Sequence, residues 1–476
     1  MARYAWAQPR TFGIAVAVIA LALAACGKKG TTTPAPGTTP TPTPLPSGVT
    51  APPYGIAGVA YLPDGGASST FHGIQVVHFE DYLGNLLGAP VAPPPNVAFS
   101  GPVGPVDFSS DETDALAAME VSLTGGTPTA PPFSFVQSVN GVLTANLTPL
   151  GNPYDVAVAP SPYPTNCPSA PASSVSPTIS DITGVAILGN GSSAVGLVLG
   201  PGTPGIVGLT TLIGAPPNFG CFVPFPNASP RANIQASSGA GVVLVRGPYD
   251  LMSLTVTAVG AGYSFAVGAD DGSLGTGTVY RGHGAFAFAP NNAGRALVAH
   301  VAPPYGAVLI TGLPSAISHA STVTLASAPY AVAISPNGLF GVIGASAGFY
   351  VVSGISSGVL TVSSPFAPSG TSGLANSPSY IDCNGHTANL QNVTSIGFSA
   401  DGRYITALGN EPAGTCPSGN NATIVVMAFN ESSGIPPTPG PSPTATAGVT
   451  PTSPPSRFTE NNIISPPTGA DYMLVR

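Results

Sequence analysis

The stretch PYAVAISPNGLFGVIGAS, residues Pro329 to Ser346, decides the fold class. Small and larger apolar residues alternate in AVAI, which is typical of a strand with two different faces. Asn337-Gly338 follows, and this dipeptide favours a two-residue hairpin in which both central residues have positive φ. LFGVIGAS continues as a second strand, FYVVSG as a third and VLTV as a fourth. The stretch therefore predicts a four-stranded antiparallel meander.

The same pattern recurs along the chain, with units that start near residues 56, 105, 183, 254, 286, 330 and 394. Residues 109–120 (SSDETDALAAME) carry a Ser-x-x-Glu capping box, which is typical of a short helix. The repeat instead predicts a strand from Ala115, and we favour the strand. PYDVAVAP, from Pro153 to Pro160, fits either the inner strand of the third unit or an outer strand of the second.

Two turns carry a family resemblance. SPNG at Ser335 and SADGR at Ser399 resemble the SPDG(R/K) turns of seven-bladed β-propellers of the YncE and lactonase-like group. WD-repeat proteins share this turn, although the chain has no Trp-Asp dipeptide. The resemblance implies an all-β propeller of seven four-stranded blades over residues 51–434. Each blade buries its faces only against its neighbours, which explains the repetition. A string of β-sandwiches is the alternative, but it does not explain the recurring turn.

The N-terminus has the features of an export signal. Arg3 and Arg10 precede the apolar run FGIAVAVIALALAA, which is too short to span a bilayer, so residues 1–25 are expected to be a signal peptide. Leu23-Ala24-Ala25-Cys26 resembles the lipobox of bacterial lipoproteins, and this resemblance implies that Cys26 is lipidated. The mature chain would then be anchored in the bacterial cell envelope, on the periplasmic or cell-surface side. An ordinary secreted protein is the alternative.

Two segments rich in Pro and Thr flank the repeats. Residues 26–50 are expected to form a disordered stalk and residues 435–456 a linker, because proline fixes φ and removes hydrogen-bond donors. The final segment, residues 457–476, ends in DYMLVR. It is either a strand that closes the ring from the chain's end or a loose tail.

The composition narrows the function classes. Only 6% of the residues are charged, 43% are hydrophobic, and the chain has 60 Gly and 56 Pro. This hydrophobicity argues against wholesale disorder and suits short strands joined by tight turns. The net charge of −8 comes with no basic stripe, so a nucleic-acid partner is excluded.

Four cysteines remain beyond Cys26, and an even number in an exported chain predicts two disulfides. Of the three pairings we favour the sequence-local one, Cys167 with Cys221 and Cys383 with Cys416. No CxxC pair is present, so zinc is the weaker explanation. We expect no metal and no cofactor.

No GxSxG, HExxH or P-loop motif is present, so no catalytic residue is predicted. Arg281 and His283, in RGHG, are the most site-like pair and could line the channel of a propeller. Asp270 and Asp271 are the best acidic cluster and a further candidate for the channel or a ligand. For these two we favour a hairpin turn, with positive φ at Gly272, over a Ca²⁺ site, which needs six to eight oxygen ligands.

The sequence thus favours a non-enzymatic envelope lipoprotein whose propeller binds a protein, peptide or glycan partner. One alternative is a lactonase-like hydrolase with its site in the central channel, because the family uses acidic, His and Arg side chains there. Another is a structural or adhesive component of the cell surface.

Overall fold

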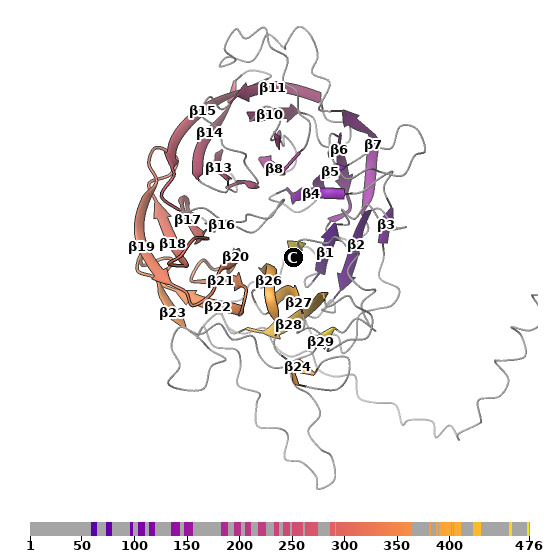
Figure 1. The fold of residues 1–476 in the computed structure, drawn as a ribbon. Coiled ribbons are helices and arrows are strands. Elements are labelled where there is room, and N and C mark those ends of the chain that lie inside the picture. The colour runs from indigo at the N-terminus through magenta and orange to yellow at the C-terminus, as the bar shows by residue number, and fades with distance from the viewer. Residues whose placement is uncertain are drawn as a thin grey trace, which may run out of the picture. The chain divides into compact units, whose positions relative to one another are not determined.

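The computed structural model is an all-β propeller of four-stranded antiparallel blades (Figure 1). All described residues belong to the compact unit Leu45–Arg476. No helix in these ranges is both long enough and apolar enough to cross a membrane. The structure describes residues 59–63, 73–78, 96–98, 103–109, 114–119, 135–142, 147–155, 182–188, 195–200, 205–210, 218–224, 233–237, 241–247, 250–259, 262–274, 286–290, 292–363, 380–381, 387–388, 390–400, 402, 404–410, 422–429, 457–458 and 474–475.

The four-stranded sheets in these ranges are called first to seventh in chain order, and their strands are as follows. The first has the order β3-β2-β1-β30, with β1 Val59–Pro63, β2 Gly73–His78, β3 Asn96–Ala98 and β30 Leu474–Val475. The second is β4 Val103–Phe108, β5 Asp114–Met119, β6 Phe135–Asn140 and β7 Thr148–Asp155. The third is β8 Gly184–Leu188, β9 Val195–Gly200, β10 Gly205–Thr210 and β11 Asn218–Pro224.

The remaining sheets follow the same meander. The fourth is β12 Asn233–Ala236, β13 Val242–Arg246, β14 Leu251–Val259 and β15 Gly262–Asp271. The fifth is β16 Phe286–Ala289, β17 Asn292–His300, β18 Gly306–Thr311 and β19 Ser318–Thr324. The sixth is β20 Pro329–Ile334, β21 Phe340–Ala345, β22 Gly348–Ser353 and β23 Thr361–Ser363. The seventh is β26 Gln391–Phe398, β27 Tyr404–Asn410, β28 Ala422–Ala428 and β29 Arg457–Phe458, and a small sheet pairs β24 Tyr380–Ile381 with β25 Thr387–Ala388.

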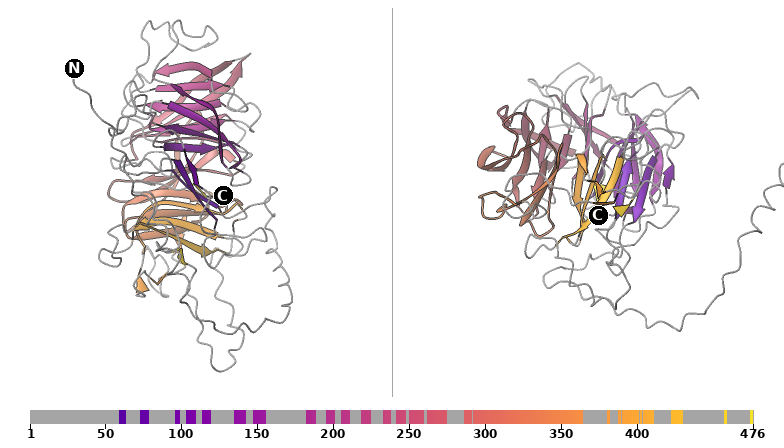
Figure 2. Two further views of the ribbon diagram at one scale, coloured as in Figure 1. Left: turned by 90° about the vertical axis from the view of Figure 1, so that its right-hand side faces the viewer. Right: turned by 60° about the horizontal axis from the view of Figure 1, so that its bottom comes forward.

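In the second to seventh sheets the first strand lies inside the unit and the fourth strand lies at its rim. Figure 1 shows β4, β8, β20 and β26 near the centre and β7, β11, β15 and β19 outside, while Figure 2 shows the sheets from two other sides. Contacts run from β4 to β8, from β8 to β12, from β20 to β26 and from β26 to β30. Neighbouring sheets therefore meet along their inner strands.

The first sheet combines strands from far apart in the sequence, β1 to β3 and β30. β30 pairs antiparallel with β1, with Ala60 opposite Val475 and Tyr61 opposite Leu474. The innermost strand of this sheet thus comes from the last residues of the chain, and β1 is its second strand. The Pro/Thr-rich segment 435–456 lies outside the described residues, yet the strands before and after it, β28 and β29, pair with each other.

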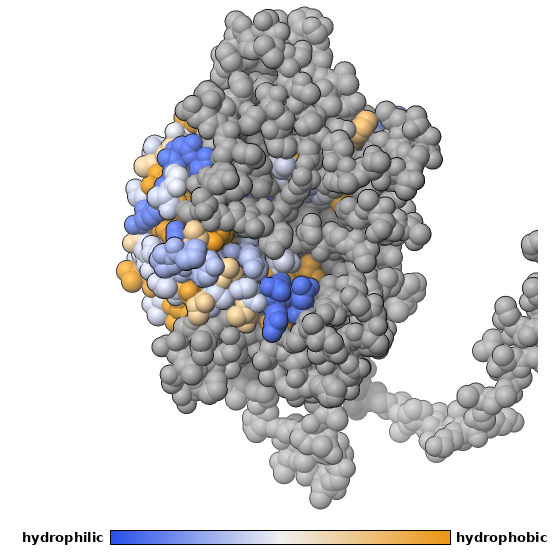
Figure 3. Space-filling view, in the orientation of Figure 1, coloured by the Kyte–Doolittle hydropathy of each residue, from blue (hydrophilic) through white to orange (hydrophobic). Residues whose placement is uncertain are grey.

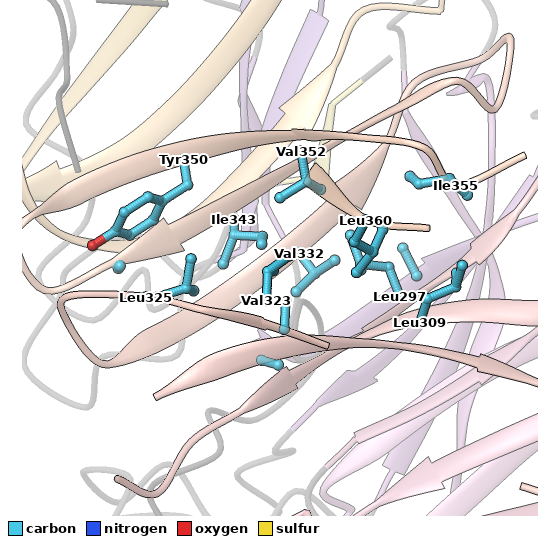
Figure 4. Packing of buried hydrophobic residues seen from close by; sticks show 14 of the residues in the cluster. Leu297, Leu309, Val323, Leu325, Val332, Ile343, Tyr350, Val352, Ile355 and Leu360 are labelled. Atoms are coloured by element: carbon cyan, nitrogen blue, oxygen red, sulfur yellow. The ribbon is translucent and has the colours of Figure 1, made fainter. Parts of the chain in front are cut away.

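Apolar side chains fill the spaces between neighbouring sheets. The cluster between the fifth and sixth sheets includes Leu297, Leu309, Val332, Ile343 and Tyr350, and Figure 4 shows them spread along the layer from Tyr350 at one end to Leu309 at the other. The Tyr350 hydroxyl ends this cluster and accepts a hydrogen bond from the backbone N–H of Ala326 (3.1 Å). Equivalent clusters join the fourth to the fifth sheet and the sixth to the seventh. Because each sheet is covered by its neighbours, burial requires the repetition seen in the sequence.

Glycine allows one of these close approaches. Gly344 in β21 faces the seventh sheet, and a Cβ atom there would lie 2.6 Å from the backbone oxygen of Val393 and 2.7 Å from its side chain. No larger residue fits without moving one sheet from the other. The two glycines in LFGVIGAS therefore belong to the packing of the strand rather than to a turn.

A buried serine organises the turn between β20 and β21. Ser335 N–H donates to Phe340 O (2.8 Å), and Phe340 N–H donates to Ser335 Oγ (3.1 Å). Gly338 N–H donates to Ser335 O (2.8 Å), so the turn is centred on Pro336 and Asn337. Gly338 has a φ of 73°, but Asn337 is not in the left-handed region and its Oδ1 accepts from Ser335 Oγ (2.8 Å). The expected hairpin with two positive φ values is wrong, because the loop is longer.

A serine at the equivalent position makes similar bonds in three other described turns. Ser399 repeats the bonds of Ser335, and Gly402 in that turn has a φ of 70°. Ser109 and Ser237 likewise donate their backbone N–H to the carbonyl of the residue five positions later, and each accepts the N–H of that residue at Oγ. All four hydroxyls lie on buried residues, so the serine replaces the water that a turn would otherwise bind.

Three sequence interpretations can be compared with these strands. The strand expected from Ala115 is β5, so the helix suggested by the capping box does not form. Pro153 to Asp155 of PYDVAVAP end β7, the outermost strand of the second sheet, and the inner-strand alternative is wrong. The unit start near residue 254 is also wrong, because Leu254 lies in the third strand of a sheet whose first strand begins at Asn233.

Candidate functional site

Of the channel and ligand candidates predicted from the sequence, the described part of the chain contains Asp270 and Asp271. Cys26, Arg281 and His283 lie outside the described residues, so their roles stay predictions. Asp270 and Asp271 end β15, the outermost strand of the fourth sheet. Figure 1 shows this strand at the rim. Both carboxylates therefore lie on the strand of the fourth sheet that is farthest from its first strand, β12.

Asp271 instead links two neighbouring sheets. Its Oδ1 accepts a hydrogen bond from Ser273 N–H (2.8 Å), and its Oδ2 lies 2.6 Å from Nε2 of His319 in β19. Partial burial alone would raise the pKa of Asp271, but the bonds from Ser273 and His319 hold it below its usual value. Gly272 is not among the residues with positive φ, so the turn depends on the Asp271 side chain rather than on glycine.

This arrangement also bears on the Ca²⁺ alternative. Both oxygens of Asp271 already accept bonds from protein groups. Ca²⁺ needs several convergent oxygens, and the described ranges hold no group of three or more His, Cys, Asp or Glu that could bind a metal. The pair of Asp271 and His319 is therefore best described as a contact between the outer strands of the fourth and fifth sheets.

Asp107 is a titratable side chain on the first strand of the second sheet that no motif in the sequence marks. It lies in β4, half-buried, and its Oδ2 accepts a hydrogen bond from the backbone N–H of Ile187 in β8 (2.7 Å). Burial raises the pKa of Asp107 to about 7, although hydrogen bonds from the Ile187 and Phe108 backbones oppose this rise. The carboxyl group joins the first strands of the second and third sheets and can change its protonation state near neutral pH.

This geometry alone does not make a catalytic site. A pKa near 7 suits a general acid or base, but such a group needs a partner that holds or attacks a substrate. The described hydrogen bond of Asp107 goes to backbone, not to a second functional side chain. The side chain of Asp107 therefore links two sheets through a hydrogen bond, and the strength of this bond depends on pH.

Both arginines that the structure describes between the Pro/Thr-rich segments bind backbone carbonyls. Arg246 in β13 is fully buried, and its guanidinium donates to Asp250 O (3.1 Å) and Leu274 O (3.5 Å). Arg295 in β17 donates to Ile355 O (2.8 Å) and to the next carbonyl, of Ser356 (2.6 Å), in the turn after β22. Arg295 therefore ties the fifth sheet to the sixth, and neither guanidinium is directed at a ligand.

The described surface offers no concentrated apolar patch. Large apolar side chains that are exposed in the described ranges are Val267, Leu339 and Val359, and they lie on three different segments. Figure 3 shows hydrophilic and hydrophobic residues interspersed over the coloured part of that face. A contact made there would consequently be polar and spread over several strands and turns.

The predicted disulfides fall largely outside the described residues. Only Cys221 lies within them, in β11, the outermost strand of the third sheet, and its side chain is not described. The pairings Cys167 with Cys221 and Cys383 with Cys416 stay predictions.

Comparison with known proteins gives similarity in structure and none in sequence. No family model matches the chain, and no curated protein matches it. A functionally unknown protein from Desulfotomaculum acetoxidans is similar in structure, with 13% identity, a TM-score of 0.47 and coverage of 79% of this chain and 93% of that one. A putative 6-phosphogluconolactonase from Bacteroides fragilis has 12% identity, a TM-score of 0.46 and coverage of 80% and 93%. The C-terminal WD40 domain of Sif2 has 9% identity, a TM-score of 0.41 and coverage of 80% and 94%.

Proposed function

We propose that the protein is a lipoprotein of the bacterial cell envelope, anchored through Cys26, whose seven sheets form one closed ring that serves as a binding module. The motif Leu23-Ala24-Ala25-Cys26 supports the anchor, since it follows an apolar run of signal-peptide length. Contacts between inner strands of successive sheets, together with the pairing of β30 and β1, support closure of the ring. The partner is a protein, peptide or glycan that contacts its turns.

One observation carries the choice of a binding module over a hydrolase. Polar side chains that could have formed a reactive cluster bridge neighbouring sheets instead: Asp107 bonds to Ile187, Asp271 to His319, and Arg295 to Ile355. These bonds fix the sheets relative to one another, which gives a rigid scaffold for exposed turns. Rigid elements that present variable turns suit recognition.

Lipid anchorage and the absence of hydrolysis can be tested separately. Cells that express the wild-type chain or Cys26→Ala are labelled with a fatty-acid probe and fractionated. The proposal expects label and membrane retention only for the wild type, and equal retention of both chains would contradict it.

The purified protein is then assayed against lactones beside Arg281→Ala and His283→Ala. Turnover by the wild type that either substitution abolishes would replace the binding module with a channel hydrolase.

A further inference from the structure

The closing strand of the first sheet is short and is held at one buried point. β30 has two residues, and both pair with β1. Leu474 is 6% exposed and packs in a cluster that contains Ile74 of the first sheet and Val103 and Val106 of the second. One side chain thus fixes the strand between two sheets, while β26 of the seventh sheet lies beside it.

The chain before β30 is long enough to reach beyond its own acceptor strand. β29 ends at Phe458, so fifteen residues separate it from Leu474. Fully extended, fifteen residues span about 50 Å. The outer and inner strands of one sheet are separated by three spacings, about 14 Å in total. The tether therefore does not restrict β30 to the β1 strand of its own copy.

We propose that the inner edge of β1 is a strand-acceptor site that takes β30 from a second copy of this chain, so that two copies exchange their C-terminal strands. The exchanged pair keeps the same register and the same burial of Leu474 as the single copy. The two forms then differ mainly in the entropy of the tether, because identical contacts contribute equally to both.

A second copy is the occupant that the contacts favour. When β30 leaves, β1 presents an unpaired strand edge beside an apolar cluster, and such an edge accepts an extended segment. The segment that complements both the edge and the cluster is DYMLVR itself. If the chain is lipid-anchored as proposed above, confinement to a membrane raises the concentration of copies, but the strand pairing does not require the anchor.

One added cysteine in each copy, at the two positions of one register pair, detects the exchange when the disulfide between positions 60 and 475 is identified by peptide mass mapping. One full-length copy carries Cys26→Ala and Ala60→Cys, the other carries Cys26→Ala and Val475→Cys, and the two have different mass tags. They are unfolded together, refolded at 0.1 and 1 mM (on the order of the effective concentration of a short tether) and oxidised. We expect a mixed disulfide dimer between positions 60 and 475 that increases about tenfold between the two concentrations.

Three controls decide the outcome. Ala60→Cys and Val475→Cys in one copy should form an internal disulfide, which shows that the positions can bond. Thr322→Cys, on the exposed strand β19, replaces Val475→Cys to measure random collisions. A synthetic peptide of residues 469–476 in excess should reduce the mixed dimer by occupying β1, whatever the stability of the variants.

The proposal is overturned if the internal disulfide forms but the mixed dimer does not exceed the Thr322→Cys control. It is also overturned if the peptide leaves a mixed dimer unchanged. Because both copies lack Cys26, failure of lipid anchorage affects neither result.

Discussion

Replacing Asp107 by Asn should change how the stability of the protein depends on pH. The amide that Asp107→Asn introduces keeps an oxygen that can accept the Ile187 N–H bond, but it cannot ionise. In the wild type the folded-state pKa is raised from 3.8 to about 7, so the folded protein binds a proton that the unfolded chain releases. The favourable contribution of this carboxyl is fully present below pH 3.8 and is lost as the pH rises through about 7.

The size of the effect follows from the two pKa values. A shift of roughly three units corresponds to at most about 4 kcal/mol at 1.36 kcal/mol per unit. Asp107 is half-buried rather than fully buried, so solvent reduces this to about 1–2 kcal/mol. We therefore expect Asp107→Asn to be more stable than the wild type by that amount at pH 8 and equally stable at pH 3.5.

Urea unfolding of both full-length proteins at a series of pH values measures this difference. The slope of the unfolding free energy against pH between 4 and 7 should be more negative in the wild type by up to about 1 kcal/mol per unit. Equal slopes, or a variant that is less stable at pH 8, would refute the assignment. Asp107 would then be ionised in the folded state and held there by the Ile187 bond.

Three other substitutions test other contacts. Leu474→Ala should lower the unfolding free energy by about 2 kcal/mol or more, because it empties a buried position. The control Val359→Ala, at a side chain that is 68% exposed, should change the unfolding free energy by less than about 0.5 kcal/mol. Equal effects of the two substitutions in urea unfolding would exclude Leu474 as an anchor. Ser399→Ala should cost about 1–2 kcal/mol, because the N–H of Tyr404 loses its acceptor, and a neutral result would mean that the serine turn is not stabilising. Asp271→Asn should be less stable than the wild type at pH 7, by an amount that shrinks as the pH falls below 3.8, because the lowered pKa gives a stability that is lost on acidification. A gap in melting temperature that does not narrow between pH 7 and pH 3 would contradict this.

The repeat could be predicted wherever strand alternation and turn chemistry agree. SPNG and SADGR were recognised because Pro or Asp and Gly mark the same turn that Ser335 and Ser399 stabilise. Ser109 and Ser237 make equivalent bonds in FSSDETD and ASSGAG, where only the serine is shared. A single serine five residues before the next strand is too common a pattern to reveal a turn.

One strand and one titratable side chain could not be predicted from the sequence. The first strand of the fourth sheet, NIQA, is difficult to predict because it has four residues and one large apolar side chain, that of Ile234. Asp107 stands in PVDF as an isolated acid, and only the approach of Ile187, eighty residues later, gives it a raised pKa. Conversely, Asp270 and Asp271 are an acidic cluster because they are neighbours in sequence, but their strand, β15, is the outermost of its sheet.

The origin of β30 has a consequence for biogenesis. The innermost strand of the first sheet is made after all the other described strands, so a ribosome-bound chain cannot complete that sheet before Leu474 and Val475 have left the exit tunnel. A chain that stops short of Leu474 leaves the inner edge of β1 uncovered, however perfectly the intervening sheets are formed. Completion of the first sheet is thereby postponed until residues 474–475 are available.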